Sequence, residues 1–119
     1  MDILQWGFIV IIAVFFLYRF LPVKGVVQIS VQEAKEKFKD SNVQFIDVRT
    51  PGEYKAYHRK PFINIPLAAL PEKAGELDKE KEVVVICQSG MRSMRAAKIL
   101  KKQGFQKVYN VKGGMNAWV

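Results

Sequence analysis

The chain contains a single cysteine, Cys87, which lies between a strand-like run and a helix-like run. Residues 83–86 before it are Val-Val-Val-Ile, and a helical pattern extends from Ser93 to Gln103 after it. A thiol at the start of a helix faces backbone N–H groups and the positive end of the helix dipole. Both features favour the thiolate, which is the nucleophilic form of sulfur. This position therefore predicts a cysteine that carries negative charge on its sulfur, or on a group bound to that sulfur.

The loop after Cys87 has the composition of an anion-binding site. Gly90 is flexible, which lets successive N–H groups converge on one point, and Arg92 adds a forked cation. A lone cysteine after a buried strand is often only a small apolar residue, but a glycine and an arginine so close to it favour the reactive interpretation. We interpret the whole loop as substrate-binding: Gln88, Ser89, Gly90, Met91, Arg92 and Ser93.

Two charged residues, Asp47 and Arg49, stand at the end of another apolar run, Val43 to Val48. Sites in parallel sheets form at the carboxyl ends of strands, so we expect this pair near Cys87. A purely structural role for the pair, as an ion pair or a helix cap, stays open. The only histidine, His58, lies in a polar loop and is more typical of a structural residue. One cysteine and one histidine leave no usual metal-ligand spacing, so no metal is expected.

The segments that hold these residues alternate between strand and helix patterns. Ser30 and Glu33 have capping-box spacing, and Thr50 before Pro51 is typical of a helix start. The predicted strands cover 26–29, 43–48, 63–66, 83–86 and 107–111; the predicted helices cover 30–39, 52–57, a broken 67–77, and 93–103. This alternation indicates an α/β fold with a central parallel sheet.

An apolar segment precedes this pattern. Residues 3–21 contain one charged residue and approach the ~20 residues that cross a bilayer as a helix. A cleaved signal peptide would need a basic start and a small-residue cleavage site, whereas the chain starts Met1-Asp2. A buried core helix would show a polar face. We therefore expect a single transmembrane helix, with residues 1–24 as anchor and linker and residues 25–119 as one domain.

The charged residues that flank the apolar segment predict the side of the membrane on which that domain lies. Arg19 and Lys24 flank the C-terminal end of the apolar segment, so the positive-inside rule places residues 25–119 in the cytoplasm. Without residues 1–24, which hold two basic residues and one acidic residue, the net charge of +8 becomes +7. The lysines are dispersed, which argues against a nucleic-acid partner. A free thiol also suits a reducing compartment.

Four stretches resemble the rhodanese family of sulfurtransferases. They are Phe45–Tyr54, Ile63–Leu67, Val85–Ser93 and Gly113–Trp118, and they occur in the family's order and at its usual spacings. The resemblance covers about residues 26–119. It implies the rhodanese fold, a three-layer α/β arrangement around a central parallel sheet.

The resemblance also implies roles for individual residues. Cys87 matches the cysteine that takes a sulfane sulfur from a donor and becomes a persulfide, and residues 88–93 match the loop around that sulfur. Arg92 matches the position that favours anionic donors such as thiosulfate. Asp47 and Arg49 match a supporting motif beside the pocket. No cofactor is implied.

Several functions compete for this pattern. The first is a sulfurtransferase that moves a sulfane sulfur from thiosulfate or a persulfide through Cys87 to a thiophilic acceptor. The alternative is a sulfur carrier or interaction module at the membrane, which exchanges sulfur with another protein and turns over small donors slowly. Phosphatases and arsenate-type reductases of the same fold resemble the pattern less, because the phosphatase loop places its arginine one residue farther from the cysteine. A structural adaptor would not need this loop.

The expected partners are a small anionic sulfur donor, a protein that gives or takes sulfur, and the membrane through residues 3–21.

Overall fold

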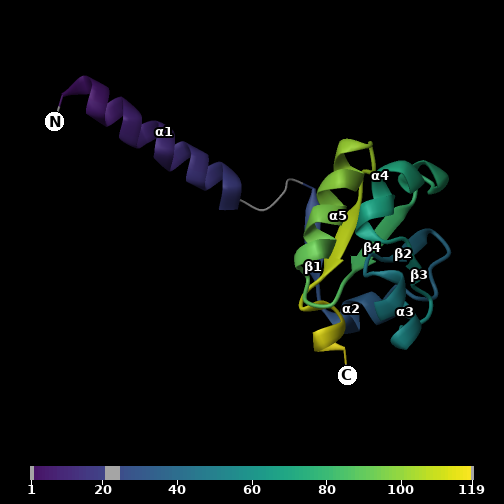
Figure 1. Ribbon diagram of the computed structural model, residues 1–119. Coiled ribbons are helices and arrows are strands. Elements are labelled where there is room, and N and C mark those ends of the chain that lie inside the picture. The colour runs from purple at the N-terminus through teal and green to yellow at the C-terminus, as the bar shows by residue number, and fades with distance from the viewer. Residues whose placement is uncertain (1, 21–24, 119) are drawn as a thin grey trace.

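The computed structural model describes residues 2–20 and 25–118. It has an N-terminal helix followed by an α/β domain (Figure 1). The elements in chain order are α1 (Ile3–Phe20), β1 (Val26–Ile29), α2 (Val31–Glu36), β2 (Val43–Asp47), α3 (Pro51–Ala56), β3 (Ile63–Asn64), α4 (Leu70–Lys73), β4 (Glu82–Ile86), α5 (Met91–Lys102) and β5 (Val108–Val111). Short 3-10 turns flank α4 at Leu67–Ala69 and Ala74–Glu76, and a third turn covers Gly114–Ala117.

The strands form one five-stranded sheet in the order β1-β5-β4-β2-β3, and its pairs are parallel. The predicted parallel sheet is therefore confirmed. β4 pairs with β2 so that Ile86 lies opposite Asp47. This register brings the residues that follow β4 and β2 to the same edge of the sheet.

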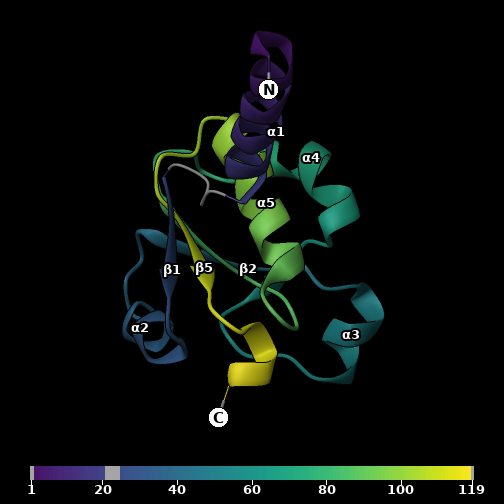
Figure 2. The same ribbon diagram turned by 90° about the vertical axis from the view of Figure 1, so that its left-hand side faces the viewer.

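Helices cover both faces of the sheet, which gives the three layers (Figures 1 and 2). Side chains of β4 alternate between the two faces: Val83 and Val85 pack with Leu100 of α5 on one side. Val84 and Ile86 pack with Ala34 of α2 on the other side. All four strand residues are fully buried. A strand covered on both faces has no solvent side, which explains the continuous apolar run in the sequence.

Element boundaries differ from the predicted ones at a few places. α5 begins at Met91, two residues before the predicted start, because Gly90 occupies the N-cap position. α2 ends at Glu36 rather than near Lys39, and a turn follows it. That turn lets Phe38 join an aromatic cluster with Phe45, Phe62 and Trp118.

The expected transmembrane helix is not supported. A helix does form within the expected segment, over Ile3–Phe20, and it extends away from the domain in Figure 1. Across residues 2–20 and 25–118, however, no helix is long and apolar enough to cross a membrane. The expected membrane partner loses its support with the helix. The predicted linker and the flanking charge of Lys24 lie outside the described residues.

Candidate active site

Cys87 follows the last residue of β4 and is fully buried. Its sulfur has two close polar contacts from the loop that leads into α5. The backbone N–H of Gly90 donates to Sγ at 2.9 Å, and Oγ of Ser93 lies 3.3 Å from Sγ. The Ser93 hydroxyl is also within 3.1 Å of the Gly90 carbonyl. Because a hydroxyl has one proton, Ser93 can give it to the carbonyl while the thiol is neutral, or to the sulfur when the thiolate forms.

These contacts decide the acidity of the thiol. Burial raises the pKa of Cys87, because a charge is less stable away from water. Hydrogen bonds from the Ser93 hydroxyl and from the N–H groups of Ser93, Gly90 and Ser89 act in the opposite direction and outweigh burial. The net pKa of Cys87 is lower than the ordinary thiol value. The site therefore favours the nucleophilic form of sulfur.

Two glycines give the backbone room to form this loop. Gly90 has φ of 103°, a left-handed conformation that side chains rarely adopt. Gly114 also has a positive φ, 57°, and a Cβ there would collide with the carbonyl oxygen of Cys87. That close approach lets the turn beginning at Gly114 hold the loop: Met115 N–H donates to Cys87 O at 2.8 Å, and Asn116 N–H donates to Gln88 O at 3.0 Å. The C-terminal turn thus fixes the backbone on which Cys87 sits.

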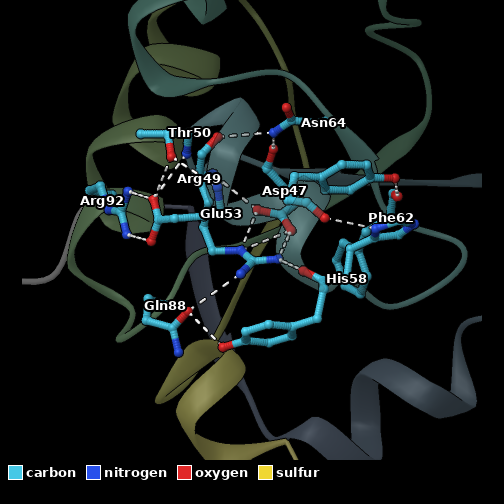
Figure 3. Close-up of polar contacts among 11 residues, drawn as sticks. Asp47, Arg49, Thr50, Glu53, His58, Phe62, Asn64, Gln88 and Arg92 are labelled. Carbon is cyan, nitrogen blue, oxygen red and sulfur yellow. Dashed lines mark hydrogen bonds and ion pairs between the residues drawn. The ribbon is translucent and has the colours of Figure 1, made fainter.

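The Gln88 side chain joins the loop to three other segments. Its amide nitrogen donates to Oδ1 of Asn116 at 2.6 Å. Its amide oxygen accepts from the Tyr57 hydroxyl at 3.1 Å and from Nη1 of Arg49 at 3.4 Å. Figure 3 shows Gln88 meeting Arg49 in this way. The Gln88 side chain therefore anchors the loop.

Asp47 and Arg49 form an ion pair with both side chains fully buried. Nη2 of Arg49 lies 2.8 Å from Oδ2 of Asp47, and Nε lies 3.1 Å from both carboxylate oxygens. Nη2 also donates to the Tyr57 carbonyl at 2.8 Å, so the guanidinium is held from several sides. The structure brings this pair beside the Cys87 loop through Gln88. Its supporting role stays a prediction, but its position suits that role.

The one cation of the loop, Arg92, is paired with a residue that the sequence interpretation did not single out. Its Nη1 and Nη2 atoms donate to Oε1 and Oε2 of Glu53 at 2.6 and 2.9 Å (Figure 3). The hydrogen bond from Arg92 is the largest cause that lowers the pKa of Glu53 to about 2. Glu53 in turn raises the pKa of Arg92. Both groups therefore stay charged at neutral pH, and Arg92 is not a free cation.

The remaining predicted residues lie farther from the sulfur or face solvent. Met91, predicted with the rest of the loop to bind substrate, is 76 % exposed. Ser89 is exposed and reaches Cys87 through its backbone N–H. His58 stacks on Tyr54 with ring centroids 3.9 Å apart, and its Nδ1 lies 2.9 Å from the Tyr54 carbonyl. Within the residues that the structure describes, no group of His, Cys, Asp and Glu side chains could hold a metal ion.

Sequence reasoning missed three residues of the site: Glu53, Tyr57 and Asn116. A local signal existed for Glu53, because Thr50 and Glu53 have capping-box spacing. Nothing in the chain around Tyr57 or Asn116 indicates their contacts with Gln88, which join positions 31 and 28 residues apart. Such contacts appear only when the sheet brings these segments together.

Comparison with known proteins agrees with this geometry. The model of the rhodanese-like domain family matches residues 30–119. The chain belongs to this family. The described geometry agrees with that assignment: a central parallel sheet, a cysteine at the end of β4, and a loop that opens α5.

Relatives of this rhodanese-like chain include proteins that are named for sulfur chemistry. YtwF of Bacillus subtilis, whose name provisionally describes a sulfurtransferase, is 46 % identical over 76 % of this chain and 88 % of YtwF. The thiosulfate sulfurtransferase GlpE of Coxiella burnetii is 37 % identical over 76 % of this chain and 85 % of GlpE. YrkF of Bacillus subtilis, provisionally named a sulfur carrier, is 41 % identical over 76 % of this chain. The match spans half of YrkF.

Solved structures share the fold. A rhodanese-like domain protein from Staphylococcus aureus superposes with a TM-score of 0.71 and is 31 % identical. The match covers 78 % of this chain and 91 % of that protein. The rhodanese-like α/β fold expected from the sequence is thereby confirmed.

Proposed function

We propose that this rhodanese-like protein is a sulfurtransferase that carries sulfane sulfur on Cys87. The observation that supports this most directly is the environment of Sγ, with the Gly90 N–H at 2.9 Å and the Ser93 hydroxyl at 3.3 Å. These donors stabilise a negative charge on sulfur inside a buried site. Relatives named as sulfurtransferases, YtwF and GlpE, give independent support.

In the proposed reaction the Cys87 thiolate attacks the outer sulfur of thiosulfate. A new S–S bond forms, the bond between the outer and central sulfur atoms breaks, and sulfite leaves with the electron pair. The products are a Cys87 persulfide anion and a sulfite dianion, so the three negative charges of the reactants are conserved. A thiophilic acceptor such as cyanide then takes the outer sulfur and returns the thiolate. An alkyl persulfide donor reacts in the same way and releases a thiolate.

The loop has the groups that this intermediate needs. A persulfide places its charge one sulfur farther from the cysteine, toward the backbone of residues 88–93. Helix α5, with 12 residues, contributes the favourable end of its dipole there. Because Cys87 has no exposed surface in the structure, the reaction requires a local movement that admits the donor. We propose Gln88, Ser89, Gly90, Met91, Arg92 and Ser93 as the residues that surround the transferred sulfur.

The direct test is thiocyanate formation from thiosulfate and cyanide by the full chain. We expect turnover by the wild-type protein and loss of it in Cys87→Ser. Mass spectrometry of the Cys87 peptide, after thiosulfate without cyanide, is expected to find one added sulfur. Equal turnover in the wild type and in Cys87→Ser would exclude the proposal.

A second function, that of a sulfur carrier for a partner protein, has its own support. The Glu53 carboxylate occupies both Nη atoms of Arg92, which leaves the loop a weaker attraction for small anions. The carrier name of YrkF points the same way. A persulfide on Cys87 that forms from a persulfide donor, with no turnover of thiosulfate, would favour the carrier over the enzyme.

We also propose that the domain, residues 25–119, works in a reducing compartment such as the cytoplasm. Cys87 is a free thiol, and reducing compartments keep thiols available for sulfur transfer. Fractionation of cells that express the full chain, followed by thiol labelling of each fraction, tests this location. Recovery of the protein only from an oxidising compartment would contradict it.

A further inference from the structure

The ion pair between Glu53 and Arg92 joins α3 to the first turn of α5 beside the candidate active site. It is bidentate, at 2.6 and 2.9 Å, and about one third of each side chain is exposed. A planar fork paired with a carboxylate in this geometry has its main hydrogen-bonding edge occupied. Arg92 is also close enough to the sulfur that, besides Glu53, a charged Cys87 raises the pKa of Arg92.

Glu53 is not a loose surface carboxylate. It is the N3 residue of the α3 capping box: Thr50 N–H donates to Oε1 at 3.1 Å, and Glu53 N–H donates to Thr50 Oγ at 3.2 Å. The Thr50 hydroxyl also lies 3.1 Å from Oε1. Helix α3 thus holds the carboxylate in the place where it receives Arg92.

The net charge of this pair affects how strongly the loop attracts anionic sulfur donors. Arg92 alone would attract anions to the loop, but the Glu53 carboxylate cancels that charge. Thiosulfate carries two negative charges, whereas cysteine persulfide has a net charge of minus one at most. Neutralising Arg92 therefore removes more attraction from the dianion than from the monoanion, because the Coulomb energy grows with the charge of the donor.

We propose that Glu53 determines donor selectivity: by neutralising Arg92 it disfavours dianionic thiosulfate and favours persulfide donors of low charge. This inference rests on the proposed sulfurtransferase function and names its donor class. For such a donor, Cys87 thiolate attacks the outer sulfur of R–S–SH, a Cys87 persulfide forms, and RS⁻ leaves with the electron pair. The proton stays on the transferred sulfur, so atoms and charge balance.

The first test compares donors in the full chain. Glu53→Gln keeps a side-chain acceptor for the capping box, since glutamine also serves there, but removes the charge. We expect the KM for thiosulfate to fall roughly tenfold and the KM for cysteine persulfide to change less than about twofold. The gain is expected to disappear in the double variant Glu53→Gln/Arg92→Gln, because it requires a free cation.

The matched control is Glu33→Gln. Glu33 is the N3 residue of the other capping box, in α2, where Ser30 N–H donates to its Oε1 at 3.2 Å. The same chemical change is made at the start of a different helix, where the carboxylate does not pair with Arg92. We expect Glu33→Gln to leave the KM for both donors unchanged.

The second test does not depend on turnover. Iodoacetate and iodoacetamide have nearly the same size but differ by one negative charge. Restricted access to the buried sulfur slows both reagents equally, so the ratio of their reaction rates with Cys87 reports the local charge. We expect Glu53→Gln to raise the iodoacetate to iodoacetamide ratio severalfold, and Glu33→Gln to leave it unchanged.

The two tests separate the possible failures. An unchanged alkylation ratio together with an unchanged or raised KM for thiosulfate in Glu53→Gln overturns the role of Glu53. If the wild-type protein takes sulfur from neither donor, the proposed function fails, and the donor assignment fails with it. In that case a raised alkylation ratio still establishes that Glu53 sets the charge at Cys87.

Discussion

The reactivity of Cys87 depends on hydrogen bonds from a few neighbours and not on exposure. Burial alone would keep the thiol protonated; the Ser93 hydroxyl is the largest of the contributions that oppose burial. The Gly90 N–H also donates a hydrogen bond to the sulfur. A single hydroxyl at the first turn of α5 therefore has a large influence on the state of the sulfur.

This argument predicts the effect of Ser93→Ala. Without the hydroxyl the thiolate loses a donor, so the pKa of Cys87 rises toward the ordinary thiol value. The pH profile of Cys87 alkylation by iodoacetamide is expected to move to higher pH, with a severalfold lower rate at neutral pH. Ser89→Ala is the control, because Ser89 acts through its backbone N–H, which alanine keeps. A profile that does not move in Ser93→Ala would contradict this account.

The buried pair of Asp47 and Arg49 supports a second prediction for single residues. Asp47→Ala leaves the guanidinium buried without its counter-charge, and such changes cost about 3–5 kcal/mol of stability. Replacing both residues, as in Asp47→Leu/Arg49→Met, removes the unpaired charge and is expected to recover part of the loss. Urea unfolding of the three proteins measures both effects. Equal stability of the wild type and Asp47→Ala would show that the pair has no structural importance.

At the scale of elements, the active loop is held between α5 and the turn at Gly114–Ala117. The turn passes so close to Cys87 that a side chain at Gly114 would meet the Cys87 carbonyl. It also supplies the N–H groups that bind the carbonyls of Cys87 and Gln88. The conformation of the loop therefore depends on two segments that are far apart in the sequence.

Gly114→Ala is expected to disturb this arrangement. The positive φ alone costs about 1–3 kcal/mol for a residue with a side chain, and the collision with Cys87 O adds to it. We expect a lower free energy of unfolding and slower alkylation of Cys87. Gly75→Ala is the control, since a Cβ at Gly75 meets nothing within 4 Å. If Gly114→Ala is as stable and as reactive as Gly75→Ala, the close approach is not important.

Local pattern predicted the elements well, because apolar periodicity and helix caps are local properties. The cap at Thr50 and the buried run before Cys87 are examples. The pairing of Arg92 with Glu53 was not predicted, since it joins residues 39 positions apart and depends on the placement of α3 over the sheet edge. A strand was predicted at 63–66, and the observed β3 is shorter because only Ile63 and Asn64 pair with β2.

At the scale of the whole molecule, α1 and the α/β domain differ in how they bury side chains. Most apolar side chains of α1 are exposed, while both core clusters of the domain are drawn from residues 26–118. The hydropathy patterns of the sequence predict the same division into residues 1–24 and residues 25–119. The sequence also predicted that the first part crosses a membrane, and no helix within residues 2–20 and 25–118 supports that prediction.

The domain is therefore expected to be stable without α1. Deleting residues 1–24 removes no member of either core cluster, so the free energy of unfolding should change by less than about 0.5 kcal/mol. Urea unfolding of residues 25–119, compared with the full chain, measures this. A large loss of stability in the shortened chain would mean that α1 packs on the domain.

The strand order determines when, during synthesis, the sheet and the Cys87 loop can be completed. β5, the last strand along the chain, lies between β1 and β4 and is the partner of β1 in the sheet. During synthesis the N-terminal strand emerges first, yet β1 must wait for β5 before it can pair. The N–H groups that hold the Cys87 loop, at Met115 and Asn116, are made later still. A ribosome-bound chain therefore carries Cys87 and its loop before it carries the turn that holds the backbone of that loop in place.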